Sequence, residues 1–138
     1  MTRYAIDAPT AIRLVREDAT VADGHQLVAP NVLRSQALSL LYRQARSGEI
    51  TKAEARALLD GITTMRIRLL GDRVSRAVAW RVAEQLDWDD TVAAEYVAVA
   101  QLQADALVTL DPHLARRVEG VVTLAPFEAL LSAGSGGV

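Results

Sequence analysis

The sequence has no cysteine, which excludes disulfide bonds, thiolate metal sites and cysteine nucleophiles. Its two histidines, His25 and His113, give little support to a zinc site or a histidine-based catalytic triad. No run of about 18 apolar residues is present, so no segment is predicted to cross a membrane. The first residues also lack the basic and long apolar stretches of a signal peptide. Together these absences predict a soluble, cytoplasmic protein.

Aromatic residues and lysine are scarce as well. Aromatic residues make up 4% of the chain, so leucine, valine, isoleucine and alanine must fill the core. The net charge of −2 excludes a global positive field that would attract nucleic acid. Lys52 is the only lysine, and every other cationic side chain is arginine. Two explanations stay open: GC-rich coding, and recognition of phosphate or carboxylate groups by planar guanidinium groups.

The spacing of apolar residues and turn signals predicts strands that alternate with helices. Strands are predicted at 3–6, 26–29, 65–70, 106–110 and 121–124. Helices are predicted at 9–17, 31–46, 52–60, 73–86, 92–102 and 112–118, with a helical turn at 126–131. Gly61 is predicted to end the third helix, and the fourth is expected to turn Val74, Ala77, Val78 and Val82 inward.

This alternation predicts a mostly parallel sheet with helices on both faces. Residues 1–131 are predicted to form one domain. Residues 132–138, rich in glycine and serine, are predicted to be a flexible tail.

Two predicted strands end on a carboxylate. Asp7 follows the first strand and Asp111 follows the strand at 106–110. Ligands of open parallel sheets bind beyond the carboxyl ends of the strands, so we expect these two acids to meet there. Carboxylates that lie together favour a divalent cation such as Mg²⁺, which can activate water and stabilise the charge on a phosphodiester. The alternative is that both acids only cap helices, since prolines typical of a first helical turn follow them.

Four segments in a fixed order resemble the PIN-domain nucleases, especially the toxins of VapBC toxin–antitoxin pairs. They are YAIDAPT, LVAPNVLRSQALSLL, AAEYVAVAQLQADALVTLD and VVTLAPFEAL, and they span essentially the whole chain. The resemblance implies a PIN-like α/β/α sandwich that binds Mg²⁺ or Mn²⁺ through acidic residues and cleaves RNA. It also implies a homodimer and a small VapB-like antitoxin whose tail covers the active site.

The resemblance assigns roles to particular residues. Asp7 matches the aspartate of the family's first strand, and Asp111 matches the acid of its T-x-D segment, with Thr109 as the supporting hydroxyl. Gln36 stands where the family usually has a glutamate. Ala93, three residues before Tyr96, stands where it usually has an aspartate. Two of the four expected acids are therefore absent.

Nearby residues are candidates to compensate for these absences. Gln36 offers an amide oxygen that can hydrogen-bond a metal-bound water. Asp90 precedes Ala93 by three residues, so it could lend a metal-binding carboxylate from one turn away, although it is more simply an N-cap. Glu95 is a poor substitute because residues two apart on a helix point to nearly opposite faces.

Arginines supply the candidate substrate contacts. Five arginines lie between residues 66 and 81, and Arg73 and Arg76 share a helix face there. They could bind RNA phosphates, or they could form a solvated face that pairs with nearby acids. Arg34, close to position 36, could hold a phosphate or an antitoxin carboxylate.

Three hypotheses follow. The first is a metal-dependent endoribonuclease, the toxin of a type II toxin–antitoxin system, with a weakened site. The second is a PIN fold that no longer cleaves and binds RNA or an antitoxin-like partner. The third is a nuclease rebuilt around Asp89, Asp90 or Glu95. Homodimer surfaces are plausible on the helices at 31–46 and 52–60.

Overall fold

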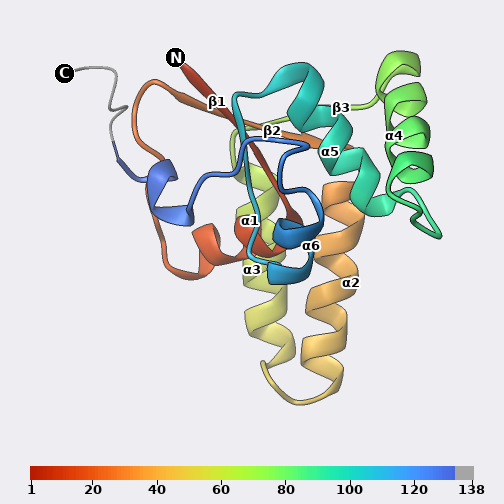
Figure 1. Ribbon diagram of the computed structural model, residues 1–138. Coiled ribbons are helices and arrows are strands. Elements are labelled where there is room, and N and C mark those ends of the chain that lie inside the picture. Colours follow the sequence, from red (N-terminus) through yellow and green to blue (C-terminus); the bar gives the residue numbers. More distant parts are fainter. Residues whose placement is uncertain (133–138) are drawn as a thin grey trace.

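The computed structural model describes residues 1–132, in which helices and strands alternate much as the sequence predicts (Figure 1). The strands are β1 (Thr2–Ile6), β2 (His25–Pro30), β3 (Ile67–Leu70) and β4 (Ala106–Val108). The α-helices are α1 (Ala8–Arg16), α2 (Val32–Arg46), α3 (Lys52–Thr64), α4 (Arg73–Gln85), α5 (Val92–Gln103) and α6 (Pro112–Arg117), and a 3₁₀ helix, η1, covers Phe127–Leu130. All of these elements lie within the predicted domain.

The four strands form one all-parallel sheet in the order β3-β2-β1-β4. From β1 the chain first builds outward through β2 to β3, and then returns to place β4 on the other side of β1. Strand order therefore reverses between β1 and β4. In open parallel sheets this is the place where ligands bind, at the carboxyl ends of the two strands. Asp7 and Thr109 are the residues that directly follow these two strands.

Side chains alternate across the sheet, so each strand contributes to two cores. Tyr4 and Ile6 of β1 pack in a core with α1, α2, α3 and η1. Ala5, between them in sequence, packs in the core formed with α4, α5 and α6. In β2, Leu27 and Val28 divide between the two cores in the same way. The result is the predicted α/β/α sandwich, which carries apolar residues on both faces of its central strands.

Gly61 does not end α3, contrary to the prediction. The helix continues to Thr64, and Gly61 lies where α3 packs closely against α1. A Cβ atom at this position would lie 2.4 Å from Cγ1 of Val15. Glycine is therefore required here because two helices approach closely, not because the helix stops.

Two other local predictions were wrong in whole or in part. Residues 121–124 form no strand, since Leu124 and Val122 make only isolated parallel bridges, to Leu107 and to Glu119. The N–H of Leu107 donates to the carbonyl of Thr123, and its carbonyl accepts from the N–H of Ala125. On α4, Val82 is buried and Val78 is partly buried, as predicted, but Val74 and Ala77 are exposed, because Ala79 and Ala83 complete the buried face of the helix. Small residues on that face allow α4 and α5 to pack closely, which hydrophobicity alone did not indicate.

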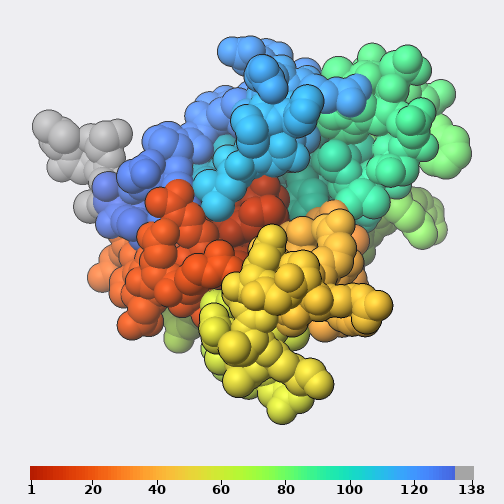
Figure 2. All heavy atoms as spheres, turned by 90° about the horizontal axis from the view of Figure 1, so that it is seen from below, coloured from red at the N-terminus to blue at the C-terminus, as the bar shows by residue number. Residues whose placement is uncertain are grey.

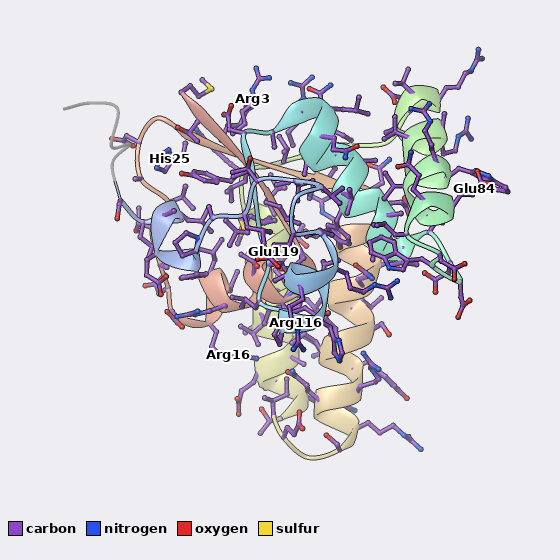
Figure 3. The ribbon with its side chains drawn as sticks, viewed as in Figure 1. Arg3, Arg16, His25, Glu84, Arg116 and Glu119 are labelled. Atoms are coloured by element: carbon purple, nitrogen blue, oxygen red, sulfur yellow. The ribbon has the colours of Figure 1, made fainter. Side chains whose placement is uncertain are left out.

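Ser132, the last residue that the structure describes, lies against the start of β2. The ring nitrogen Nε2 of His25 lies 2.6 Å from the carbonyl oxygen of Ser132, the first residue of the predicted tail. Figure 3 shows His25 beside the segment that contains η1. Residues 133–138 of the predicted tail lie outside the described residues. Within residues 1–132, no helix is both long and apolar enough to span a bilayer.

Candidate functional site

A cleft of about 400 Å³ lies at the carboxyl ends of β1 and β4. Its lining comes from the start of α1, one face of α2, the start of α5 and the loop before α6: Asp7, Ala8, Pro9, Gln36, Ser39, Leu40, Arg43, Asp90, Val92, Ala93, Tyr96, Asp111 and Leu114. Figure 2 views this end of the molecule, where the dark red start of the chain is visible between the blue α6 region and the orange α2. In Figure 3, Arg3 at the start of β1 and Arg16 at the end of α1 lie at different heights of the molecule, and the α2–α3 hairpin projects beyond Arg16.

Asp7 is the buried acid of this cleft, with 5% of its surface exposed. It caps α1: its Oδ1 accepts a hydrogen bond of 3.0 Å from the backbone N–H of Thr10, and another from the Thr10 hydroxyl. Its Oδ2 accepts a 2.6 Å hydrogen bond from the Thr109 hydroxyl. These donors hold the carboxylate in one orientation and compensate for the water that it loses on burial.

Thr109 connects the two predicted acids. Its hydroxyl oxygen donates to Asp7 and accepts a 3.1 Å hydrogen bond from the backbone N–H of Asp111. Asp111 is exposed, and its Oδ1 caps α6 by accepting from the N–H of His113 at 2.9 Å. Both acids are therefore helix caps and both line the cleft, so the capping role does not exclude a functional one. His113 itself is exposed and outside the lining.

Gln36 and Tyr96 form a pair that the sequence did not reveal. The buried hydroxyl of Tyr96 donates a hydrogen bond to Oε1 of Gln36, from α5 to α2. Burial raises the pKa of Tyr96, and the negative charges of Asp7 and Glu95 raise it further. Tyr96 therefore stays neutral and keeps its proton for Gln36.

The third predicted metal ligand, Asp90, lines the cleft but is engaged elsewhere. Its Oδ1 accepts a 3.1 Å hydrogen bond from the N–H of Val92, the first residue of α5, while the N-cap position itself is occupied by Thr91 and not by Asp90 as the simpler prediction had it. Across residues 1–132, no group of three or more histidine, cysteine, aspartate or glutamate side chains is close enough to hold a metal ion. Asp7, Asp90 and Asp111 thus share a cleft without forming a compact metal centre.

None of the three predicted arginines lines the cleft of Asp7. Arg34 is exposed on α2 and outside the cleft lining. Arg73 and Arg76 line a separate cleft of about 280 Å³, at the ends of β2 and β3, together with Glu95. The arginine that lines the cleft of Asp7 is Arg43, which sequence reasoning missed. The sequence did offer a signal for it: Arg43 lies seven residues after Gln36, and residues seven apart share a helix face.

Glu95 belongs to the same second cleft, where partial burial raises the pKa of its carboxyl group. Asp89 is exposed and lines neither cleft. Of the acids considered for a rebuilt site, Asp90 is the one that lines the cleft of Asp7, so the third hypothesis stays a prediction that depends on Asp90.

No protein-family model and no curated protein sequence matches the chain. Among solved structures, PAE2754 from Pyrobaculum aerophilum is similar, with a TM-score of 0.73. The match covers 94% of this chain and 93% of that chain, at 24% sequence identity. This likeness concerns the fold: a four-stranded parallel sheet between helices, as in PIN-like proteins.

Proposed function

We propose that this PIN-like protein is a divalent-cation-dependent endoribonuclease, the toxin of a type II toxin–antitoxin pair, with Asp7 and Asp111 at the centre of its site. The observation that carries the proposal is the hydrogen-bonded unit Asp7–Thr109–Asp111 at the switch point between β1 and β4. It links two carboxylates from opposite ends of the sequence at the position where this sheet topology favours a ligand.

The residues present suit a weakly held Mg²⁺ or Mn²⁺. Mg²⁺ retains several waters and needs only one or two carboxylates in addition to substrate phosphates. Oδ2 of Asp111 accepts no hydrogen bond within residues 1–132, and Oδ2 of Asp7 accepts one, so each keeps a lone pair for a cation. When bound, such an ion activates water and stabilises the charge of a phosphodiester under attack.

The protein's own residues orient and shield this site. Thr10 and Thr109 fix the Asp7 carboxylate, and burial of Asp7 strengthens its attraction for a cation because little water screens it. Asp111 lies at the exposed rim, where a substrate can reach it. The absence of acids at positions 36 and 93 lowers the ligand charge, so we expect millimolar rather than micromolar use of the cation.

Calorimetric titration with Mg²⁺ and Mn²⁺, together with RNA cleavage with and without EDTA, tests the proposal. Asp111→Asn should abolish cation binding and cleavage, because it leaves one carboxylate in the unit. Asp60→Asn, which removes an exposed charge on α3 away from the cleft, is the matched control and should change neither. A native protein that cleaves equally well in EDTA, or an Asp111→Asn variant with full activity, contradicts the cation mechanism.

A second candidate is a PIN-like binding protein that no longer cleaves RNA. The hydrogen bond from Tyr96 to the neutral Gln36 favours it, because this bond occupies the oxygen that a metal-bound water would otherwise use. Gln36→Glu combined with Ala93→Asp restores two carboxylates to the cleft. Strong cation-dependent cleavage that appears only in this double variant supports the binding protein, whereas cleavage by the native chain contradicts it.

The proposed homodimer has a candidate surface on α2. Leu38 and Tyr42, one helical turn apart, are 55% and 54% exposed, which is unusual for large apolar side chains that lie next to each other. Sedimentation of the native protein and of Leu38→Glu tests this surface: a dimer that becomes a monomer supports it. Co-expression with a VapB-like antitoxin, followed by the cleavage assay, tests neutralisation of the toxin.

A further inference from the structure

One wall of the cleft is built from a single face of α2. Gln36, Ser39 and Arg43 lie at spacings of three and four residues, so a helix presents them on the same side. All three line the cleft, and the acids Asp7 and Asp111 line it from other elements. The cleft therefore has an acidic side and a side whose one charged residue is an arginine.

The hydrogen bond from Tyr96 determines which end of the Gln36 amide is left free. A phenol hydroxyl has one proton, and Tyr96 donates it to Oε1 of Gln36. The remaining polar group of Gln36 is its NH₂, which makes no hydrogen bond within residues 1–132.

This orientation changes what position 36 can recognise. An NH₂ group carries two hydrogen-bond donors and no acceptor, so it binds anions and carbonyl oxygens and repels a metal ion. A glutamate here would present a carboxylate and do the opposite. Arg43 adds a planar guanidinium with five donors on the same wall. Within residues 1–132 it forms no ion pair, since the one ion pair there joins Arg13 and Glu17.

We propose that Gln36 and Arg43 form an anion-binding wall that holds the phosphate oxygens of single-stranded RNA. This inference rests on the proposed function for its choice of RNA as the ligand. Gln36 donates through its NH₂ group, Arg43 donates through its guanidinium, and Tyr96 is a positioning residue that keeps the amide turned. The acidic side is left to the cation, so the two walls contact different parts of one phosphodiester.

RNA binding in the absence of metal separates this wall from catalysis. The probe is a fluorescein-labelled single-stranded RNA of mixed sequence, followed by fluorescence anisotropy in EDTA over a range of salt concentrations. Arg43→Ala should weaken binding about tenfold or more, because a charge-assisted hydrogen bond is lost. The slope of log Kd against the logarithm of the salt concentration should also decrease by about 0.7, the value for one phosphate contact on a single strand.

Arg34→Ala is the matched control for Arg43→Ala. Both arginines are exposed on α2, but Arg34 lies outside the cleft, so its loss should change the affinity by less than about twofold. Equal losses for the two variants, or no RNA binding by the native protein in EDTA, would overturn the proposal.

Gln36→Glu tests the direction of the amide. It should weaken RNA binding in EDTA more than Gln36→Ala does, because it places a negative charge beside the phosphate. In calorimetry the same variant should bind Mg²⁺ more tightly than the native protein. RNA binding by Gln36→Glu as tight as that of the native chain would contradict the donor role of Gln36. These binding results stand whether or not the native protein cleaves RNA, so failure of the wall and failure of the nuclease proposal are distinguishable.

Discussion

The hydroxyl of Thr10 offers a direct measurement of how firmly the Asp7 carboxylate is held. Thr10 is fully buried, and its hydroxyl lies between Oδ1 of Asp7 and the carbonyl oxygen of Val108, 3.2 Å away. The hydroxyl has one proton, and the shorter contact to Asp7 shows where it is donated. Thr10→Val removes this donor while keeping a side chain of nearly the same size.

The size of the effect follows from the charge and burial of the acceptor. Loss of a hydrogen bond to a buried charged group costs about 1.5–3 kcal/mol, so we expect about 2 kcal/mol for Thr10→Val. For 138 residues the unfolding entropy is about 0.3 kcal/mol/K, which converts this loss to a decrease in Tm of about 7 °C. With a urea slope of about 2 kcal/mol/M, the unfolding midpoint should decrease by about 1 M.

Urea unfolding of the native protein, Thr10→Val and Thr10→Ser provides the assay. Thr10→Ser keeps the hydroxyl and loses one buried methyl group, which costs about 1 kcal/mol. In an Asp7→Asn background, Thr10→Val should cost only about 1 kcal/mol, because a hydrogen bond to a neutral acceptor is about half as strong. The reasoning is refuted if Thr10→Val costs no more than Thr10→Ser, or if its cost is the same in the Asp7→Asn background.

Three further measurements test other parts of the structure. Gly61→Ala should lower the free energy of unfolding by about 1–3 kcal/mol through the clash with Val15, although alanine is the better helix former. In a Val15→Ala background the same substitution should stabilise the protein, and equal effects in both backgrounds would contradict the packing argument. Burial raises the pKa of Tyr96, so the absorbance difference at 295 nm between the native protein and Tyr96→Phe should show no phenolate at pH 11, where an ordinary tyrosine has titrated. Burial also raises the pKa of Glu95, so its charge opposes folding above pH 4.5. Glu95→Gln should therefore unfold at higher urea than the native protein at pH 7, and the difference should vanish as the pH decreases below about 4.

Much of the fold follows from local sequence patterns. Alternation in the strands places Ala5 opposite Tyr4 and Ile6, and apolar spacing at three and four residues sets the faces of the helices. The capping residues are similarly local: the Thr51 hydroxyl caps α3 by accepting a hydrogen bond from the backbone N–H of Glu54, three residues later. Prediction fails where a residue's role depends on a neighbour that is distant in sequence. A local pattern predicts that Gly61 ends a helix, but glycine is needed there to leave room for Val15, which is 46 residues earlier in the chain.

The candidate site divides along the same line. The order of residues places Asp7 and Asp111 after strands, and parallel strands carry such residues to one edge of the sheet. Helical spacing likewise places Gln36 and Arg43 on one face of their helix. Which way this face of α2 points depends on tertiary packing, because the contacts of α2 with α1 and α3 set its rotation and turn the face toward the cleft of Asp7.

Packing also decided which chemistry the cleft presents. Arg73 and Arg76 lie in another cleft because α4 begins at the end of β3, away from the switch point between β1 and β4. The direction of the Gln36 amide depends on Tyr96, which is 60 residues away in sequence and reaches α2 from α5. A local pattern can place a residue on a face of its own helix. The same pattern carries no information about the side chain that a neighbouring helix brings into contact, and that side chain sets the direction of the hydrogen bond.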